Sequence, residues 1–273
     1  MKKVSITLVL YNNDINMIKN TITSCMQDIK PSDIYVVDNS TNINLQIIES
    51  FYKINYLKNI NKGFGNGHNQ AFTKFNLIKN HEYNLVLNPD ITFEKHTLKK
   101  LIAYLDKNPD VGALMPKILN LDGSLQFARR CLPTPIHLIY KRIFPNSKIS
   151  IEYEIKNFEP KVPIELIGIC GCFMLLRLKV IKKTQLFDER FFMYFEDFDL
   201  ARRMSLSSKV IYYPLEKVFH GSERGHRKSL TLLFFLINSA IKYFLKWGVV
   251  DDYRKKTNTK LLREIKSKNA ETC

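Results

Sequence analysis

The chain has 273 residues, of which 45% are hydrophobic and 25% charged, ordinary globular usage that excludes a disordered or collagen-like chain. Its 42 Lys and Arg against 26 Asp and Glu give a formal net charge of +16. Such a charge is typical of proteins that bind anionic partners, namely phosphates, anionic lipid headgroups or nucleic acid, but it also fits a basic surface that is simply solvated. Five scattered cysteines without C-x-x-C spacing indicate reduced thiols rather than a disulfide framework or a zinc site.

The first 115 residues alternate short β-branched runs with helical patterns. Strands are expected at Val4–Leu10, Ile34–Asp38, Ile54–Leu57, Leu85–Leu87 and Val111–Met115, and helices at Asp14–Gln27, Asn42–Phe51, Gln70–Asn80 and Glu94–Lys107. Such alternation is typical of βαβ units. It predicts an α/β fold with a mostly parallel, Rossmann-like sheet flanked by helices on both faces.

The pattern changes after residue 115 without a linker or a repeat. Asp122-Gly123 indicates a hairpin turn. It is followed by an apolar run at Leu166–Leu176, a helix around Asp197–Leu206 and a strand at Val210–Tyr213. We therefore expect one domain over residues 1–228 and a basic helical tail over residues 229–273.

The most lipid-like stretch is Leu230 to Val250, in which Asn238, Lys242 and Lys246 interrupt the apolar run. A membrane-spanning helix needs roughly 20 apolar residues. A buried or interfacial amphipathic helix therefore fits this stretch better than a membrane span.

Polar residues follow three of the predicted strands: Tyr11-Asn12, Asp38-Asn39 and Asn88-Pro89-Asp90. Ligands of parallel sheets bind beyond the carboxyl ends of the strands. The three groups should then share one crevice, where the carboxylate of Asp90 suits a hard divalent cation that also binds substrate phosphates.

The segment from Asn61 to Gly67 lacks a dinucleotide fingerprint, because the third glycine of G-x-G-x-x-G would fall at His68. We expect either a loop that brings backbone close to a ligand or a simple helix-entry turn.

Glu196, Asp197 and Asp199 stand among aromatic residues, and a carboxylate beside a core is costly unless it is used or paired. Two interpretations remain open: helix capping, with Asp199 pairing with Arg202 or Arg203, or a general base facing a cleft. His220 adjoins a Gly-rich basic loop, which favours metal or phosphate binding.

In this order, six segments resemble family 2 glycosyltransferases, inverting enzymes of GT-A fold. They are Ser5–Asn13, Val36–Ser40, Asn61–Asn69, Asn88–Asp90, Gly168–Arg177 and Phe191–Leu200. Asn-Pro-Asp in place of D-x-D, with Phe192-Met193-Tyr194 before Glu196-Asp197, looks most like bacterial rhamnosyltransferases, which use dTDP-L-rhamnose to build O-antigen, capsule or cell-wall saccharides on a lipid carrier.

The resemblance implies a role for each matching position. Asp197 would be the catalytic base, with Glu196 beside it for the acceptor or for orientation. The nucleotide-sugar residues would be Leu10, Tyr11, Asp38, Asn39, Gly63, Gly65, Asn88 and Asp90. Asp90 and His220 would hold Mg²⁺ or Mn²⁺ on the diphosphate, and Arg129 and Arg130 would hold the diphosphate of the acceptor.

The implied partners are dTDP-rhamnose or another nucleotide sugar and a polyprenyl-diphosphate-linked saccharide. The basic and amphipathic segments would then bind the cytoplasmic face of the bacterial inner membrane peripherally. Three alternatives stay open: a UDP-sugar donor, a non-catalytic carbohydrate-binding protein and a nucleic-acid-binding protein. The last is disfavoured, because the aromatics lie in apolar runs or beside carboxylates and not among the basic residues.

Overall fold

A computed structural model describes residues 3–41, 45–221 and 229–270. Its centre is a nine-stranded sheet in the order β3-β2-β1-β4-β8-β6-β9-β5, with β7 paired to β9. The strands are β1 Val4–Leu10, β2 Ile34–Asp38, β3 Asn55–Lys58, β4 Tyr83–Leu87, β5 Ile91–Phe93, β6 Val111–Asn120, β7 Ile164–Glu165, β8 Phe173–Arg177 and β9 Lys209–His220. The α-helices are α1 Ile15–Met26, α2 Ile47–Tyr52, α3 Phe64–Lys74, α4 Leu77–Asn80, α5 Thr97–Lys107, α6 Pro135–Ile143, α7 Lys148–Tyr153, α8 Leu178–Thr184, α9 Glu196–Ser205, α10 Leu230–Trp247 and α11 Asp252–Ala270.

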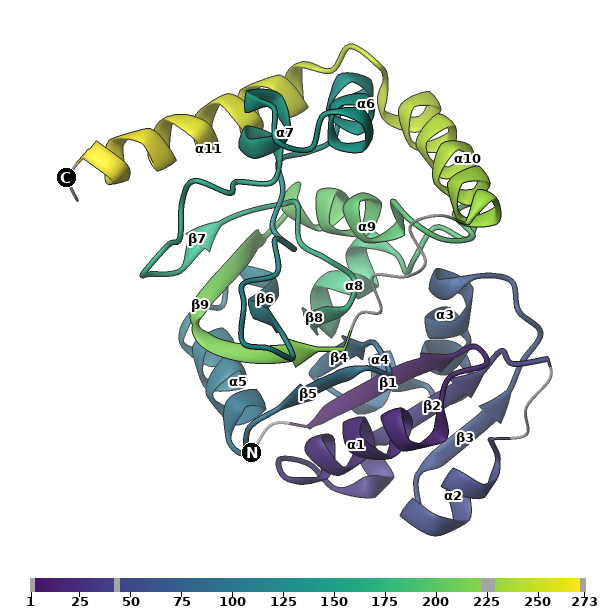
Figure 1. Ribbon diagram of the computed structural model, residues 1–273. Coiled ribbons are helices and arrows are strands. Elements are labelled where there is room, and N and C mark those ends of the chain that lie inside the picture. The colour runs from purple at the N-terminus through teal and green to yellow at the C-terminus, as the bar shows by residue number, and fades with distance from the viewer. Residues whose placement is uncertain (1–2, 42–44, 222–228, 271–273) are drawn as a thin grey trace.

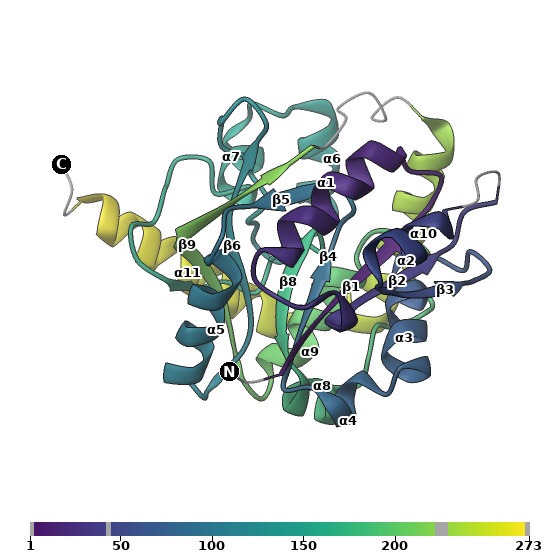
Figure 2. The ribbon, with the colours of Figure 1, turned by 90° about the horizontal axis from the view of Figure 1, so that it is seen from below.

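The amino-terminal half confirms the predicted parallel βαβ arrangement. β2 and β4 flank β1, β3 flanks β2, and all these pairs are parallel. Every residue of β1, β2 and β4 is buried, as expected for strands covered on both faces. Figure 2 shows α1 and α3 on opposite sides of this sheet.

The second half of the chain continues the same sheet, and its strand pairing is mixed. β8 runs antiparallel to both β4 and β6, and β6 runs parallel to β9. β9 is much longer than the expected Val210–Tyr213 and reaches His220, where it pairs with β5. A turn around Gly123 (φ +81°) follows β6, as the Asp-Gly pair predicted.

Of the two interpretations of Asn61–Gly67, the structure confirms the helix-entry turn rather than an extended loop. α3 begins at Phe64 and includes Gly65 and Gly67, with Gly63 as its N-cap at φ +106°. The expected helix at Gln70–Asn80 is instead the end of α3 followed by the single turn α4. The expected helix at Asn42–Phe51 is the shorter α2, and residues 42–44 lie outside the described part of the chain.

The tail is helical and forms the two helices α10 and α11. In Figure 1, α10 and α11 lie beside α6 and α7 at the top of the molecule, far from α1 and α2 at the bottom. Tyr243 of α10 and Leu261 and Ile265 of α11 join the hydrophobic core. The tail therefore packs on the sheet domain.

Candidate functional site

The carboxyl ends of β2, β1 and β4 lie side by side. Leu10 is opposite Asp38, and Leu8 is opposite Leu87. The amide of Asn39 donates to the carbonyl oxygen of Leu10 at 2.9 Å, which joins the two loops beyond β1 and β2. The polar residues after these strands thus share one sheet edge, as the strand pattern predicted, and the side chain of Tyr11 is half exposed there.

Asp38 is completely buried at this edge, and three donors hold its carboxylate. Tyr56 Oη and Lys58 Nζ donate to Oδ2 at 2.6 and 2.8 Å, and the amide of Ser40 donates to Oδ1 at 2.8 Å. Burial opposes ionisation, but the bonds from Lys58, Ser40 and Tyr56 outweigh it and lower the pKa of Asp38 below its ordinary value. Asp38 is therefore a fixed anion that holds Lys58, whose side chain is half exposed, at this edge of the sheet.

Asp90 and His220 meet where β5 pairs with the end of β9. His220 Nε2 lies 3.2 Å from Asp90 Oδ1, and His220 Nδ1 lies 2.7 Å from Gln126 Oε1. Burial alone would lower the pKa of His220, but the adjacent Asp90 carboxylate raises it overall. The Gln126 contact orients the ring so that Nε2 faces Asp90.

This pair fits part of a divalent-cation site. Asp90 Oδ1 is buried and has no hydrogen-bond donor besides the imidazole among the described residues. Within the same part of the chain, no group of three or more His, Cys, Asp and Glu side chains could enclose a metal. Mg²⁺ sites commonly combine one or two protein ligands with waters and substrate phosphates, so two side chains suit a cation that arrives with a diphosphate.

Asp197 stands in the first turn of α9 with both carboxylate oxygens held by backbone. Oδ2 accepts from the amide of Gly171 at 2.9 Å, and Oδ1 accepts from the amide of Phe198 at 2.8 Å. Its neighbour Glu196 is 6% exposed, and its Oε2 has no partner within the described residues. Neither side chain caps the helix, because the N-cap is Phe195 without a side-chain bond.

The two carboxyl groups have raised pKa values. Burial raises the pKa of Asp197, although the amides of Gly171 and Phe198 and the charge of Arg130 partly oppose it. Burial and then the charge of Asp197 raise the pKa of Glu196 well above its usual range. A carboxylate with a raised pKa is a better proton acceptor near neutral pH than an ordinary one.

The backbone before α9 is strained. Tyr194 and Phe195 have φ values of +70° and +67°, a conformation that costs about 1–3 kcal/mol for a residue other than glycine. Phe195 is fixed there because its ring packs against Tyr243 and Phe244 of α10, at 5.2 and 6.3 Å between centroids. Such strain is typical of segments that present functional side chains.

Arg130 lies close enough to Asp197 for their charges to interact. Burial opposes the charge of Arg130, but Tyr153, Cys170, Glu154 and Asp197 together raise its pKa, and its Nε has no partner among the described residues.

The predicted phosphate role of Arg129 is wrong. Its side chain is 1% exposed, and its guanidinium pairs with Glu159 at 2.8 Å and donates to the carbonyl of Phe158. A buried guanidinium with such partners supports the fold and is closed to a ligand.

The glycines of α3 serve close packing against the segment before α9. A Cβ on Gly63 would lie 2.2 Å from the carbonyl oxygen of Phe192, and one on Gly65 would lie 2.9 Å from the Cβ of Phe187. The amide of Phe64 donates to that same Phe192 oxygen at 2.9 Å. Gly63 and Gly65 therefore position the loop that leads to Asp197.

Sequence reasoning missed two asparagines that complete this contact. Asn66 Nδ2 and Asn69 Nδ2 each donate to the carboxylate of Glu189 at 2.8 Å, and Asn69 also exchanges bonds with the backbone of Phe187. The i, i+3 spacing of the asparagines was the available signal, but it has meaning only once residues 64–74 are recognised as a helix.

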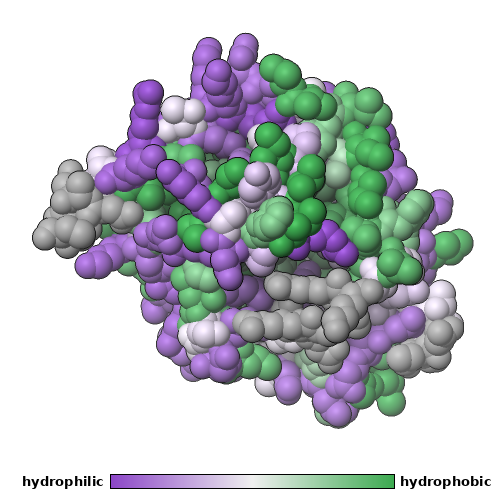
Figure 3. Space-filling view, turned by 45° about the horizontal axis from the view of Figure 1, so that its top comes forward, coloured by the Kyte–Doolittle hydropathy of each residue, from purple (hydrophilic) through white to green (hydrophobic). Residues whose placement is uncertain are grey.

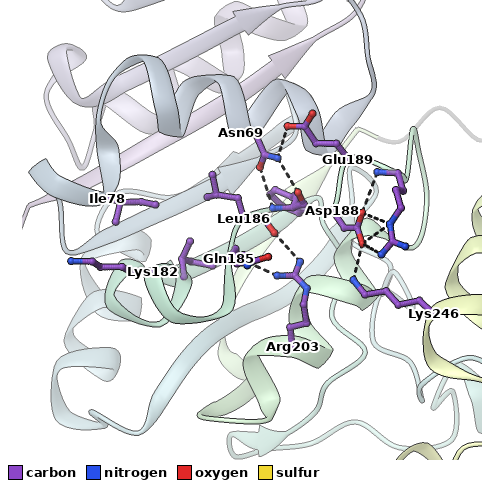
Figure 4. Close-up of a pocket in the computed structure, with 12 residues that line it drawn as sticks. Asn69, Ile78, Lys182, Gln185, Leu186, Asp188, Glu189, Arg203 and Lys246 are labelled. Atoms are coloured by element: carbon purple, nitrogen blue, oxygen red, sulfur yellow. Dashed lines mark hydrogen bonds and ion pairs between the residues drawn. The ribbon is translucent and has the colours of Figure 1, made fainter.

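A pocket of about 810 Å³ lies behind this contact, between α3, α8 and α9 (Figure 4). Several of its polar side chains have partners in the lining: Asn69 binds Glu189, Lys246 binds Asp188, and Arg203 donates to the backbone carbonyl of Leu186. It includes none of Asp38, Asp90 and Asp197. The pocket therefore lies beside the 185–190 segment and apart from the strand-end residues and Asp197.

α10 packs along the segment that carries the carboxylates. Ser239 Oγ donates to the carbonyl of Met193, and Lys246 Nζ and Trp247 Nε1 donate to Oδ1 of the buried Asp199 at 2.7 and 2.8 Å. Arg203 holds the other oxygen of Asp199 at 2.9 Å, which confirms the predicted i, i+4 pair.

By length and composition, α10 is the one helix in the described ranges that would be able to cross a membrane. Its polar contacts with Met193 and Asp199 attach α10 to the domain.

Known proteins resemble this chain in sequence. The profile of Glycosyl transferase family 2 matches residues 5–184. Rhamnosyltransferase WbbL of Escherichia coli K12 is 25% identical over 91% of this chain and 95% of its own length. N-acetylglucosaminyl-diphospho-decaprenol L-rhamnosyltransferase of Mycobacterium tuberculosis H37Rv is 30% identical over half of this chain, and the match spans 46% of that protein.

Solved structures share the fold at low sequence identity. GalNAc-T7, crystallised with UDP, GalNAc and Mn²⁺, superposes with a TM-score of 0.60 at 14% identity, over 81% of this chain and 44% of that one. Residues 1–349 of S. aureus TarS superpose with a TM-score of 0.54 at 20% identity, over 80% and 60% of the two chains. With a family profile over most of its length and a GT-A sheet, the chain belongs to glycosyl transferase family 2.

Proposed function

We propose that this chain is an inverting rhamnosyltransferase that moves L-rhamnose from dTDP-L-rhamnose to a hydroxyl of a lipid-linked saccharide in surface polysaccharide synthesis. The names of its E. coli and M. tuberculosis relatives support the sugar and the acceptor. The observation that carries the proposal is Asp197, a carboxylate with a raised pKa that two backbone amides hold in place.

Asp197 is the proposed general base. The acceptor hydroxyl oxygen forms a bond to the anomeric carbon while the bond from that carbon to the nucleoside diphosphate breaks on the opposite face, and Asp197 takes the hydroxyl proton. One displacement of this kind inverts the anomeric configuration. Positioned proton transfer contributes about 10²–10⁴-fold. Glu196, buried beside the base, orients it or contacts the acceptor.

The donor would lie along the sheet edge. Leu10, Tyr11, Asp38 and Asn39 would hold the nucleoside, and Asn88 and Asp90 would face the diphosphate. Gly63 and Gly65 would contribute by positioning the loop before α9, since both pack against it. Lys58, fixed by Asp38 at 2.8 Å, adds a positive charge at the same edge.

Asp90 and His220 are the proposed protein ligands of Mg²⁺ or Mn²⁺. When bound there, the cation would stabilise the negative charge of the leaving diphosphate. The Mn²⁺ in the GalNAc-T7 structure supports a cation in this fold.

The acceptor side would be formed by Arg130 and the tail. The unpartnered Nε and positive charge of Arg130, close to Asp197, suit the diphosphate of a polyprenyl carrier. Residues 1–228 would form the catalytic domain, and residues 229–273 would hold it peripherally on the cytoplasmic face of the inner membrane through α10.

A UDP-sugar donor is the second candidate. It is supported by the two structural neighbours with UDP bound, GalNAc-T7 and TarS. The fold and the base would be unchanged, because a different sugar or nucleoside changes only the shape of the pocket.

Nucleotide release from a donor panel tests the proposal. The panel contains dTDP-rhamnose, UDP-glucose, UDP-GlcNAc and UDP-galactose, with a GlcNAc-diphosphate-lipid acceptor, with and without EDTA. We expect acceptor-dependent release of dTDP alone and its loss in EDTA. Release of UDP would select the second candidate. No nucleotide release from any of the four donors would contradict both candidates.

A further inference from the structure

α6 has a face that the rest of the fold leaves uncovered. Ile136, Ile139 and Ile143 are 56%, 54% and 60% exposed, and their i, i+3, i+7 spacing places them on one side of the helix. Phe144, directly after the helix, is 55% exposed. No residue of α6 is fully buried, so this helix lies on the domain rather than in it.

α10 has a matching stripe on the face opposite its contacts with the catalytic segment. Its exposed apolar residues follow one another at intervals of three or four: Leu230, Phe234, Ile237, Ile241 and Leu245. Val249 and Val250 continue the stripe beyond the helix.

The two helices are neighbours. Asn258 of α11 exchanges two 2.9 Å bonds with the backbone of Leu132, just before α6, and Arg254 of α11 lies 5.7 Å from the ring of Phe244 in α10. Figures 1 and 2 both show α6 next to α10. Figure 3 shows hydrophobic side chains gathered at the upper right, where α10 lies, and continuing toward the middle of the view. We call the stripes of α6 and α10 together the α6–α10 surface.

The charge around this surface is basic. Neither helix contains Asp or Glu, and two exposed basic residues stand nearby: Arg142 at the end of α6 and Lys148 at the start of α7. A second copy of a chain with a net charge of +16 would bring two basic faces together. Anionic lipid headgroups would neutralise them, since each Lys or Arg near such a surface contributes about 1 kcal/mol.

We propose that the α6–α10 surface docks on an anionic lipid bilayer, with α6 as a second insertion element beside α10. The inference rests on the proposed function only for its lipid-linked acceptor. Arg130 is four residues before Thr134, the N-cap of α6. Docking through α6 would therefore bring the acceptor-side arginine close to the headgroup layer, where the diphosphate of a polyprenyl carrier lies.

Sedimentation with vesicles tests the proposal. The intact chain, the variant Ile136→Ser/Ile139→Ser/Ile143→Ser and the control Ile47→Ser/Phe51→Ser are mixed with phosphatidylcholine vesicles with or without phosphatidylglycerol. Ile47 and Phe51 of α2 are 66% and 72% exposed at the far end of the molecule. We expect the intact chain and the control to bind the anionic vesicles, and the α6 variant to bind about tenfold or more weakly because apolar insertion is lost.

Two results would overturn the proposal: equal vesicle binding by the α6 variant and the intact chain, or a vesicle-free dimer that the α6 substitutions abolish. Turnover with a short-chain, water-soluble acceptor separates this test from the proposed function. The α6 variant should keep that turnover. If vesicle binding is as expected but the intact chain and both variants show no turnover, the proposed enzyme activity is contradicted and the proposed docking surface is not.

Discussion

The amide of Gly171 donates to Asp197 Oδ2 at 2.9 Å and so joins the turn before β8 to the first turn of α9. These residues are 26 positions apart in the chain. A Cβ on Gly171 would lie 3.3 Å from the Cβ of Asp197, so the two backbones approach closely. The orientation of the proposed base is therefore set by the central sheet as well as by its own helix.

Replacing Arg130 should change the pH dependence of transfer. The charge of Arg130 lowers the pKa of Asp197, and a general base must be ionised to act. In Arg130→Gln the acid limb of the kcat profile should move to higher pH. Arg142→Gln, which removes an exposed arginine, should leave the limb in place. An unmoved limb in Arg130→Gln would show that the two side chains are not coupled.

Cation binding should depend on the protonation of His220. Asp90 raises the pKa of His220, so the protonated ring persists to higher pH than usual, and a cation must displace that proton. The affinity for Mn²⁺, measured by electron paramagnetic resonance, should rise as pH rises through this raised pKa. His220→Ala should bind Mn²⁺ more weakly and without this dependence, whereas His96→Asn, at an exposed position, should behave as the parent. Equal affinity in His220→Ala would remove the imidazole from the site.

Gly63 should be far less tolerant of a methyl group than Gly123. Both have positive φ, but a Cβ at Gly123 has no atom within 4 Å, whereas one at Gly63 would collide with the Phe192 carbonyl. In urea unfolding, Gly123→Ala should cost about 1 kcal/mol, and Gly63→Ala about 3 kcal/mol or more with reduced kcat. Similar losses for both variants would mean that the contact with Phe192 is not close in solution.

The buried Asp199 should be essential for stability. Asp199→Ala would leave Arg203 without its counter-charge and Lys246 with Asp188 alone, which we expect to cost about 3–5 kcal/mol in the free energy of unfolding. The control is Asp110→Ala, which removes an exposed pair with Lys209 and should leave the free energy of unfolding close to that of the parent. A small loss in Asp199→Ala would indicate that α10 is not fixed to α9 through this carboxylate.

The parallel half of the fold and the polar residues at its strand ends were predictable because both follow from local patterns. Buried strands alternate with helices, and polar residues such as Asp38 and Asp90 come directly after strands. The pairing of Asp199 with Arg203 was also predictable from helical spacing.

The glycines of α3 and the burial of Arg129 depend on residues far away in the sequence. Glycine disfavours helices, so Gly65 and Gly67 pointed to a loop. Phe187 and Val9, which leave no room for a side chain there, are visible only in the folded chain. Arg129 looked like a surface cation because its partner Glu159 is 30 residues away, across a bend that no local pattern reveals.

The central claim is that Asp197 removes the proton of the acceptor. The most direct test is single-turnover transfer by Asp197→Asn, with donor binding measured on the same preparation and Asp110→Asn as the matched control. We predict that the single-turnover rate constant of Asp197→Asn falls by about 10²–10⁴-fold while its donor affinity is unchanged, and that the control behaves as the parent. Near-normal turnover in Asp197→Asn would contradict the assignment.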